Sequence, residues 1–387
     1  MSNSVRELDI AIAHKDNVVD GGGERLCRQL GEAFDAPIYS GHVPDDRDTD
    51  MVDIFGDHGL AKRAISRGGV TRQLAYMLMW RRHADDLREY DVVITSGNEP
   101  LWYTPEEEQT MVAYVHHTLR RQHDRVAEVD SWLETVYGMG VQVLFDHNIR
   151  KPDLYVCNSE LVAHRLTHYF GVPEGRIRVV YPGVPVTEFG PDRAETGDYY
   201  FACSRLVDHK RFDELVRAFA DLDERLVIAG KGDAREHLEA MATDNVEFLG
   251  YVSENEKRRR LAEAKAFCFG ATQEDFGIAP AEALASGTPL ITVSEGFPAK
   301  MVTEGKSGLT YDRGAENLQA AIRRFESAGV EWTAQQIAAF ADRFSMDRFN
   351  QEIREAVSEA RERTEVDPEW DIAEIERQPL RADGGDE

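Results

Sequence analysis

The chain has 387 residues, which is more than one hydrophobic core usually supports, so its length predicts two domains. Asp and Glu number 71 against 45 Lys and Arg, and the resulting formal net charge of -26 argues against a protein that binds nucleic acid. Because the acidic excess is spread along the whole chain, it favours a halophilic protein whose self-repulsion is screened by high salt. An ordinary acidic protein is the alternative.

Cysteine usage and hydropathy indicate a cytoplasmic protein. The cysteines Cys27, Cys157, Cys203 and Cys268 are far apart and form no paired spacing, which favours buried, reduced thiols. No apolar run approaches the roughly 20 residues that span a bilayer, and the first residues lack the pattern of a signal peptide. We therefore expect a cytoplasmic location, with at most a peripheral contact at the inner face of a membrane.

Short apolar, β-branched runs alternate with helical patterns along most of the chain, as is typical of parallel α/β sheets. A first series of expected strands covers residues 8–13, 92–95, 112–116, 154–157 and 177–181. A second series covers residues 199–203, 226–229, 246–249, 266–269 and 290–293. The two series predict two doubly wound domains of the α/β class, and the aperiodic segment 182–198, rich in Pro, Gly and charge, is the expected linker.

The same patterns set the expected domain boundaries. We expect a Rossmann-like domain at 1–185 and a second Rossmann-like domain at 186–345. A helix at 346–365 should cross back toward the first domain, and we expect the acidic tail at 366–387 to be disordered.

The first expected strand leads into a run of three glycines, Gly21, Gly22 and Gly23, and then an amphipathic helix. Glycine lets the backbone approach an anion closely, and the free amides of a helix start favour phosphate. A flexible loop with a helix cap is the alternative. The spacing is not the dinucleotide fingerprint, because it lacks G-x-G-x-x-G directly after a strand.

The segment 62–82 reverses the sign of an otherwise acidic chain. It carries basic residues at Lys62, Arg63, Arg67, Arg72, Arg81 and Arg82, and an apolar run at Met77, Leu78, Met79 and Trp80. This combination predicts docking on anionic lipid or on a phosphate-linked lipid acceptor. An ordinary helix that buries its Leu and Met face is the alternative.

Arg205 and Lys210 follow the first expected strand of the second domain, where open parallel sheets bind their ligands. A guanidinium and an ammonium side by side suit a diphosphate, because they stabilise the negative charge that grows as a glycosyl bond breaks. Two solvated basic side chains are the alternative.

Glu274 and Glu282 are the acidic candidates of the second domain. Glu274 lies in the loop after an expected strand, and Glu282 lies in the first turn of a helix opened by Pro280. One carboxylate can therefore point toward a ligand from the loop, while the other accepts hydrogen bonds from vicinal hydroxyls. Alternatively, Glu282 stabilises the helix dipole and Glu274 is a surface acid.

The run Asp46, Asp48 and Asp50 imitates the D-x-D motif of metal-dependent glycosyltransferases. It precedes no matching fold pattern and lies in an acidic background, so we interpret it as a solvated loop and expect no metal site. The cations Arg205 and Lys210 would replace a metal ion on the diphosphate.

Six stretches in order resemble glycosyltransferase family 4, a family of retaining enzymes with the GT-B fold: GGGERL, YVHHTLRRQHD, YVCNSELVAHRL, VVYPGVPVTEF, SRLVDHKRF and EDFGIAPAEALASGTPLI. The resemblance covers nearly all of the chain apart from the acidic tail. It is nearest to bacterial and archaeal enzymes that add mannose or related sugars to lipid-linked or envelope glycans. It implies two Rossmann-like domains facing a cleft and transfer of a hexose from GDP-mannose, or next from a UDP-sugar, to a glycan or lipid-linked acceptor.

The resemblance also implies roles for single residues. Arg205 and Lys210 would hold the donor diphosphate, Glu282 the ribose, and Glu274 the sugar hydroxyls. The remaining positions are the amides of Phe276, Gly277 and Ile278 around the sugar, Gly22 and Gly23 at the phosphates, His116 facing the sugar, and Arg120 as a further basic position.

Two departures affect the acceptor side and the shape of the sugar pocket. His117 stands where a small polar residue is usual, and residues 297–300 replace a segment that usually holds a glutamate. Two other functions remain open on the same fold: a nucleotide-sugar 2-epimerase, which needs no acceptor, and a non-catalytic partner subunit.

Overall fold

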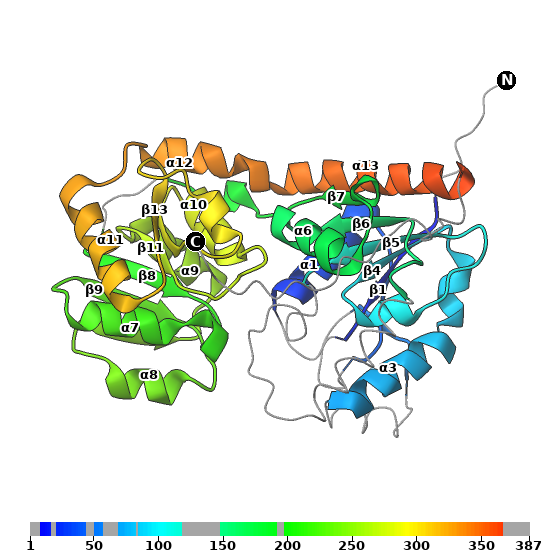
Figure 1. Cartoon of the computed structure of the whole chain (residues 1–387), viewed down its shortest axis with the longest axis horizontal. Coiled ribbons are helices and arrows are strands. Elements are labelled where there is room, and N and C mark those ends of the chain that lie inside the picture. Colours follow the sequence, from blue (N-terminus) through cyan, green and yellow to red (C-terminus); the bar gives the residue numbers. More distant parts are fainter. Residues whose placement is uncertain are drawn as a thin grey trace, which may run out of the picture. The chain divides into compact units, whose positions relative to one another are not determined.

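The computed structural model describes residues 8–16, 21–43, 50–56, 69–82, 84–117, 148–191 and 197–366. It divides into two compact units, the first comprising Met1–Val180 with Glu352–Glu387 and the second Tyr181–Gln351. The division falls after Val180, whereas the sequence patterns set it after residue 185. Each unit is built on one parallel sheet (Figure 1).

The described part of the first unit holds a sheet of seven parallel strands. In sheet order these are β3 (Val52–Asp53), β2 (Ile38–Ser40), β1 (Ile10–His14), β4 (Val92–Ser96), β5 (Thr110–Val115), β6 (Leu154–Cys157) and β7 (Ile177–Val179). Its helices are α1 (Gly22–Phe34), α3 (Gly69–Arg82) and α6 (Glu160–Phe170), with short 3₁₀ turns between. The order 3-2-1-4-5-6-7 is the doubly wound arrangement that the alternating pattern predicts.

One face of this sheet is covered by α3 and α6. Ala11, Val93 and their neighbours pack against Tyr76 and Trp80 of α3, while residues of β5 and β6 pack against Leu166 and other apolar side chains of α6. Helix α6 begins where the Ser159 hydroxyl accepts a hydrogen bond from the Val162 amide, at 3.3 Å. Burial on both faces explains why the strands read as continuous apolar runs.

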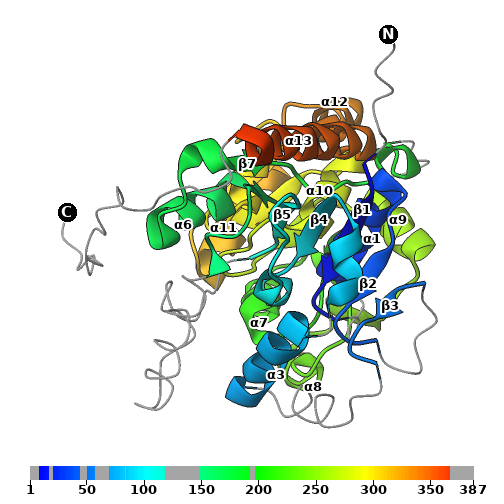
Figure 2. The same cartoon turned by 90° about the vertical axis from the view of Figure 1, so that its right-hand side faces the viewer.

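The chain ends with α13 (Met346–Val366), whose residues from Glu352 onward belong to the first unit. Arg354 donates to the Ala33 carbonyl, and Arg178 pairs with Glu359 at 2.6 Å. Thr364 bonds to Thr110 at the start of β5. Figure 2 shows the red end of α13 beside β7. These bonds hold the second half of α13 along the first unit.

The second unit has six parallel strands among its described residues. In sheet order these are β10 (Val246–Gly250), β9 (Arg225–Ala229), β8 (Tyr199–Cys203), β11 (Phe267–Phe269), β12 (Leu290–Val293) and β13 (Gly308–Tyr311). The helices are α7 (Phe212–Ala220), α8 (Arg235–Met241), α9 (Glu254–Glu263), α10 (Ile278–Ala285), α11 (Ala315–Ala328) and α12 (Ala334–Phe340). Phe219 of α7, Leu238 of α8 and Ile322 of α11 share one core cluster with Tyr200 and Ile228 of the sheet.

All ten strands expected from the sequence are present, with ends that differ by up to two residues. The sequence prediction missed β2, β3 and β13, because two of them are only two or three residues long and β13 begins with Gly308. The four cysteines are free; Cys27, Cys157 and Cys268 are buried as expected, whereas Cys203 is only partly buried.

Strand order reverses between β1 and β4 in the first sheet and between β8 and β11 in the second. At such a switch point the loops that leave the two strands run in opposite directions and open a crevice at their carboxyl ends. Most of the residues singled out in the sequence follow β5, β8 or β11, or lie near the starts of α1 and α10. The prediction that Glu282 lies in the first turn of its helix is wrong, because α10 begins at Ile278, before Pro280, and Glu282 lies beyond the first turn.

Candidate active site

The cationic part of the site follows β8. Arg205 is exposed, and its guanidinium forms no hydrogen bond or ion pair with the other described residues. Lys210 ends a 3₁₀ turn (Asp208–Lys210), and its half-buried ammonium contacts the carboxylate of Glu274. The same ammonium lies 5.8 Å from the centre of the Phe269 ring. The structure thus brings two predicted site residues, Lys210 and Glu274, into one ion pair at the switch point.

The loop that carries Glu274 is held by backbone contacts on two sides. The Thr272 amide donates to the His209 carbonyl at 2.9 Å, which ties this loop to the turn before Lys210. The Phe297 amide donates to the Glu274 carbonyl at 2.8 Å. Gly296 has φ of 75°, and a Cβ there would lie 2.6 Å from the Glu274 amide nitrogen. The position of Glu274 therefore depends on a glycine that the sequence analysis did not single out.

The predicted sugar-contacting amides lie at the start of α10. Phe276 is buried and stacks on Phe297 with ring centres 5.6 Å apart. Gly277 caps the helix with φ of 93°, and a Cβ there would come within 2.9 Å of Pro298. Amides in the first turn of an α-helix have no partner within the helix and carry partial positive charge, so Ile278 and its neighbour offer donors to an oxygen.

Glu282 is 1% exposed, and it is held by a lysine that the sequence analysis missed. Lys257 of α9 lies 3.0 Å from the Glu282 carboxylate and 2.8 Å from Glu254. Burial lowers the pKa of Lys257, but the two carboxylates outweigh it, so the pKa is raised above its ordinary value. Nothing in the run ENEKRRRLAE distinguishes this lysine from its exposed basic neighbours.

In the first unit, the structure brings together the glycine run and His116. Gly21 caps α1, and its amide donates to Glu24 at 3.0 Å. A Cβ at Gly23 would lie 4.0 Å from Nδ1 and Cε1 of the His116 ring. The other ring nitrogen of His116, Nε2, lies 2.7 Å from the Ser96 hydroxyl.

Two further residues complete this cluster, and the sequence analysis missed both. Ser96 Oγ also contacts His14 Nδ1 at 3.1 Å, and both residues are fully buried. His14 ends the apolar run IAIAH and Ser96 ends VVITS. Their polar side chains at strand ends are the signal that could have found them, because the two strands pair in register at these residues.

Several predicted features lie outside the described residues. They are Arg120, Asp46, Asp48, Lys62, Arg63 and Arg67. Asp50 is exposed. No group of three or more His, Cys, Asp or Glu side chains within the described ranges is arranged to hold a metal ion. Likewise, none of the helices in the described part is long and apolar enough to cross a membrane.

The prediction that the apolar run of α3 docks on lipid is wrong for two of its residues. Met79 and Trp80 belong to the core cluster against the first sheet, because they lie on the inner face of the helix. Leu78 is 47% exposed, and Leu74, one turn earlier, is 44% exposed. Arg81 and Arg82 are also exposed at the end of the helix.

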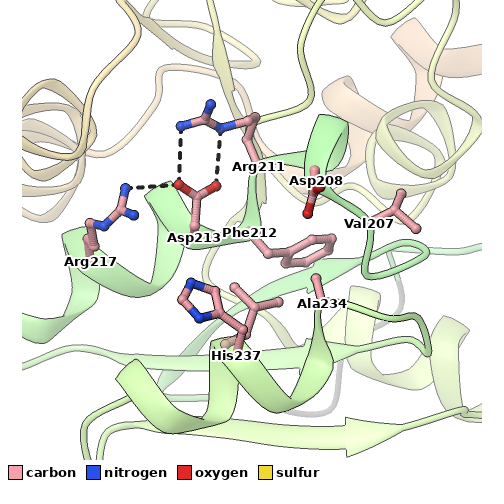
Figure 3. Close-up of a pocket in the computed structure, with 9 residues that line it drawn as sticks. Val207, Asp208, Arg211, Phe212, Asp213, Arg217, Ala234 and His237 are labelled. Atoms are coloured by element: carbon pink, nitrogen blue, oxygen red, sulfur yellow. Dashed lines mark hydrogen bonds and ion pairs between the residues drawn. The ribbon is translucent and has the colours of Figure 1, made fainter. Parts of the chain in front are cut away.

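A cavity of about 220 Å³ lies beside this site in the second unit, between α7 and α8 (Figure 3). Arg211 and Arg217 on its rim both bind Asp213, at 3.1 and 2.8 Å, and His237 faces them from α8. The predicted site residues do not line this cavity. Since its two arginines already share a carboxylate, we assign the site to the open switch point and not to this cavity.

Two doubly wound parallel units with charged side chains at the strand ends define the GT-B class of glycosyltransferase folds. Residues 20–188 match the family described as Glycosyltransferase Family 4, and residues 187–343 match Glycosyl transferases group 1. The chain therefore carries one domain of each description, and both descriptions are of glycosyltransferases.

Individual relatives are distant. The chain is 27% identical over 237 residues to the D-inositol 3-phosphate glycosyltransferase of Nocardioides sp., covering 52% of this chain and 51% of that protein, so it spans about half the length of this relative. It is 26% identical to the O-antigen chain mannosyltransferase RfbU of Salmonella typhimurium, over 61% of this chain and 70% of that protein. The solved structure of HepE from Anabaena with UDP and glucose is similar in fold, with a TM-score of 0.68, 16% identity, and 91% and 99% of the two chains covered.

Proposed function

We propose that the chain transfers a sugar from a nucleotide diphosphate sugar to an acceptor hydroxyl. The observation that carries the proposal is the arrangement at the second switch point. Arg205 is exposed there without a carboxylate partner among the described residues, and Lys210 follows it in the same connection between β8 and α7. In an acidic chain, an unneutralised guanidinium at the ligand-binding edge of a parallel sheet favours an anionic ligand.

The chemical step needs charge stabilisation at the leaving group. As the bond between the anomeric carbon and the diphosphate oxygen breaks, negative charge develops on the diphosphate, and Arg205 and Lys210 supply fixed positive charge to it. The acceptor oxygen forms the new bond to the anomeric carbon, and its proton passes to the departing diphosphate. A chain with two such cations needs no divalent ion for this step, and we propose metal-independent transfer.

Glu274 has two tasks in this proposal. Its carboxylate fixes the Lys210 ammonium, and its other lone pairs accept hydrogen bonds from sugar hydroxyls. The amides of Phe276, Gly277 and Ile278 face oxygen atoms of the sugar, and Glu282 accepts hydrogen bonds from the ribose hydroxyls. Lys257 holds the Glu282 carboxylate in place for this task.

We further propose a hexose as the transferred group, with retention of its anomeric configuration. Mannose from GDP-mannose comes first, since the relative RfbU is named as a mannosyltransferase, and UDP-sugars come second. A glycan or lipid-linked molecule is the proposed acceptor. These finer assignments rest on the family resemblance and on distant relatives.

The test is a thermal-shift screen of GDP, UDP and their sugars in high salt, because a ligand that binds only the folded state raises its melting temperature. The stabilising sugar nucleotide is then incubated with and without acceptors, and the product is analysed by NMR. We expect an acceptor-dependent glycoside of retained configuration, formed equally well in EDTA. Epimerisation of the donor without an acceptor, or no response to any sugar nucleotide, would overturn the proposal.

We also propose that the exposed end of α3 contacts anionic lipid. Leu74 and Leu78 lie one turn apart on the exposed face, and Arg81 and Arg82 follow them. Co-sedimentation with phosphatidylglycerol vesicles at the working salt concentration should be reduced in Leu74→Ser/Leu78→Ser. Equal recovery of this variant and the wild type with the vesicles, or absence of both, would count against the contact.

A further inference from the structure

The side chains of His14, Ser96 and His116 contact one another in series in the first unit; His14 and Ser96 are fully buried and His116 is partly buried. Ser96 Oγ lies 3.1 Å from His14 Nδ1 and 2.7 Å from His116 Nε2. A serine hydroxyl has one proton to donate. If it donates to one histidine, it must accept from the other, so the protonation states of the two rings are linked.

The charge on His14 decides which group donates and which accepts in each of these two hydrogen bonds. A histidine that carries a proton on both nitrogens can only donate, so a charged His14 makes Ser96 an acceptor from His14 and a donor to His116 Nε2. A neutral His116 must then carry its proton on Nδ1. If His14 were neutral and accepted from Ser96, His116 would have to donate from Nε2, and its Nδ1 would become an acceptor.

The surroundings favour the charged state at His14. Glu24 of α1 is 4% exposed, and its Oε1 lies 3.9 Å from His14 Nε2. Burial lowers the pKa of His14, but the neighbouring Cys27 and Glu24 outweigh it, so the pKa is raised to about 10. Lys15 also faces Glu24, at 3.7 Å.

The surroundings of His116, in contrast, favour a neutral ring. Burial lowers its pKa, and the charges of His14, His117 and Lys15 lower it further, so its ring stays neutral. The Asn158 amide donates to the His116 carbonyl at 2.7 Å and fixes the backbone there. The Nδ1 edge of the ring faces Gly23, in the first turn of α1, whose free amides are also donors.

We propose that His14 is a positioning residue: held as an imidazolium beside Glu24, it acts through Ser96 to lock His116 as the neutral Nδ1–H tautomer. His116 then presents a hydrogen-bond donor, not a base, beside the start of α1. This inference rests on the proposed function for its use, since the acceptor of that hydrogen bond would be a sugar hydroxyl or phosphate oxygen of the nucleotide sugar.

The tautomer can be measured without any substrate. In the full chain labelled with ¹⁵N-histidine, long-range ¹H–¹⁵N spectra at pH 7.5 report each ring nitrogen, and His14→Leu and His116→Asn assign the two rings. We expect two protonated nitrogens on His14, and on His116 a protonated Nδ1 with an unprotonated Nε2. A proton on Nε2 of His116, or a neutral His14, would overturn the proposal.

Two variants test the direction of control. Glu24→Gln keeps an acceptor for the Gly21 amide but removes the charge beside His14. We expect His14 to titrate near neutral pH in this variant, and the His116 proton to move from Nδ1 to Nε2 as it does. In His14→Leu we expect a mixture of both tautomers. An unchanged Nδ1–H tautomer in both variants would show that the relay does not set it, and Glu24→Gln suffices should His14→Leu fail to fold.

Titration with the stabilising sugar nucleotide separates this inference from the proposed function. We expect the His116 Nδ1 resonance to shift on binding, and kcat/KM of His14→Leu to fall about 10-fold, the loss of one neutral hydrogen bond. A correct tautomer that does not respond to any sugar nucleotide would leave the relay intact and contradict the proposed use of His116.

Discussion

Lys257 Nζ lies 3.0 Å from Glu282 Oε2, so the carboxylate proposed to bind the ribose has a nearly buried cation beside it. Removing one partner of a buried pair leaves the other charge poorly compensated. We predict that Lys257→Met lowers the free energy of unfolding by about 3 kcal/mol, measured by urea denaturation. It should also weaken binding of the sugar nucleotide by about 10-fold, since Glu282 loses its orientation.

Arg259 of the same helix is the matched control. It is 47% exposed and pairs with Glu256 and Glu263 on the surface, where ion pairs contribute little. We expect Arg259→Met to change the stability by less than about 1 kcal/mol and to leave nucleotide binding unchanged. Equal losses of stability and of nucleotide affinity in the two variants would contradict the role of Lys257 in holding Glu282.

Gly296 supports Glu274 through close backbone packing. Gly296→Ala adds a Cβ at 2.6 Å from the Glu274 amide nitrogen and at φ of 75°, so we predict both lower stability and lower transferase activity. Gly305→Ala is the control, because Gly305 has φ of 72° and nothing within 4 Å of its added Cβ. Backbone strain alone costs about 1 kcal/mol there, with activity retained. Unfolding experiments measure the stability and steady-state assays measure the activity. Similar losses of activity in the two variants would contradict the claim that Gly296 positions Glu274.

The buried pair of His14 and Glu24 predicts a pH dependence of stability. The pKa of His14 is raised from 6.5 to about 10. Its contribution to the free energy of unfolding is therefore complete below about pH 6.5 and is lost as the pH rises toward 10. The pKa of Glu24 is lowered from 4.5 to about 2, so its contribution is present above about 4.5 and is lost only as the pH falls toward 2.

The difference in unfolding free energy between the wild type and His14→Leu isolates the His14 contribution, because other groups cancel. We predict that this difference shrinks by at least about 1 kcal/mol between pH 7 and pH 10 at constant salt. A difference that stays constant over this range would mean that His14 is neutral in the folded chain.

The net charge of -26 predicts a requirement for salt. The Debye length falls from about 10 Å at 0.1 M salt to about 3 Å at 1 M, so high salt screens repulsion among the carboxylates. We expect the melting temperature to fall by more than about 5 °C when KCl is lowered from about 2 M to 0.1 M. Sucrose of equal osmolality should not replace KCl, and a melting temperature indifferent to KCl would remove the halophilic interpretation.

The sequence predicted the sheets well because parallel strands buried on both faces form continuous apolar runs, such as residues 199–203. It could not predict β3, which is two residues long. Nor could it predict that the side chains of Met79 and Trp80 are buried in the core, because this depends on how α3 packs. Lys210 and Glu274 lie in motif-like stretches that the sequence analysis singled out, and the structure pairs them with each other.

Partners without a motif were missed. Lys257 lies in a basic run, and His14 and Ser96 become neighbours only through the pairing of β1 with β4. These contacts are tertiary: His14 and Ser96 are 82 residues apart in the chain, and Lys257 and Glu282 are 25 apart. Local sequence patterns do not encode them.

The central claim is that Arg205 and Lys210 bind the diphosphate of the donor. The most direct measurement is calorimetric titration of the stabilising nucleoside diphosphate, and of the matching nucleoside monophosphate, into the wild type, Arg205→Ala, Lys210→Ala and the surface control Arg324→Ala. We predict that each of the first two variants weakens diphosphate binding by about 100-fold and monophosphate binding far less, with Arg324→Ala like the wild type. Unchanged diphosphate affinity in folded Arg205→Ala and Lys210→Ala would contradict the account.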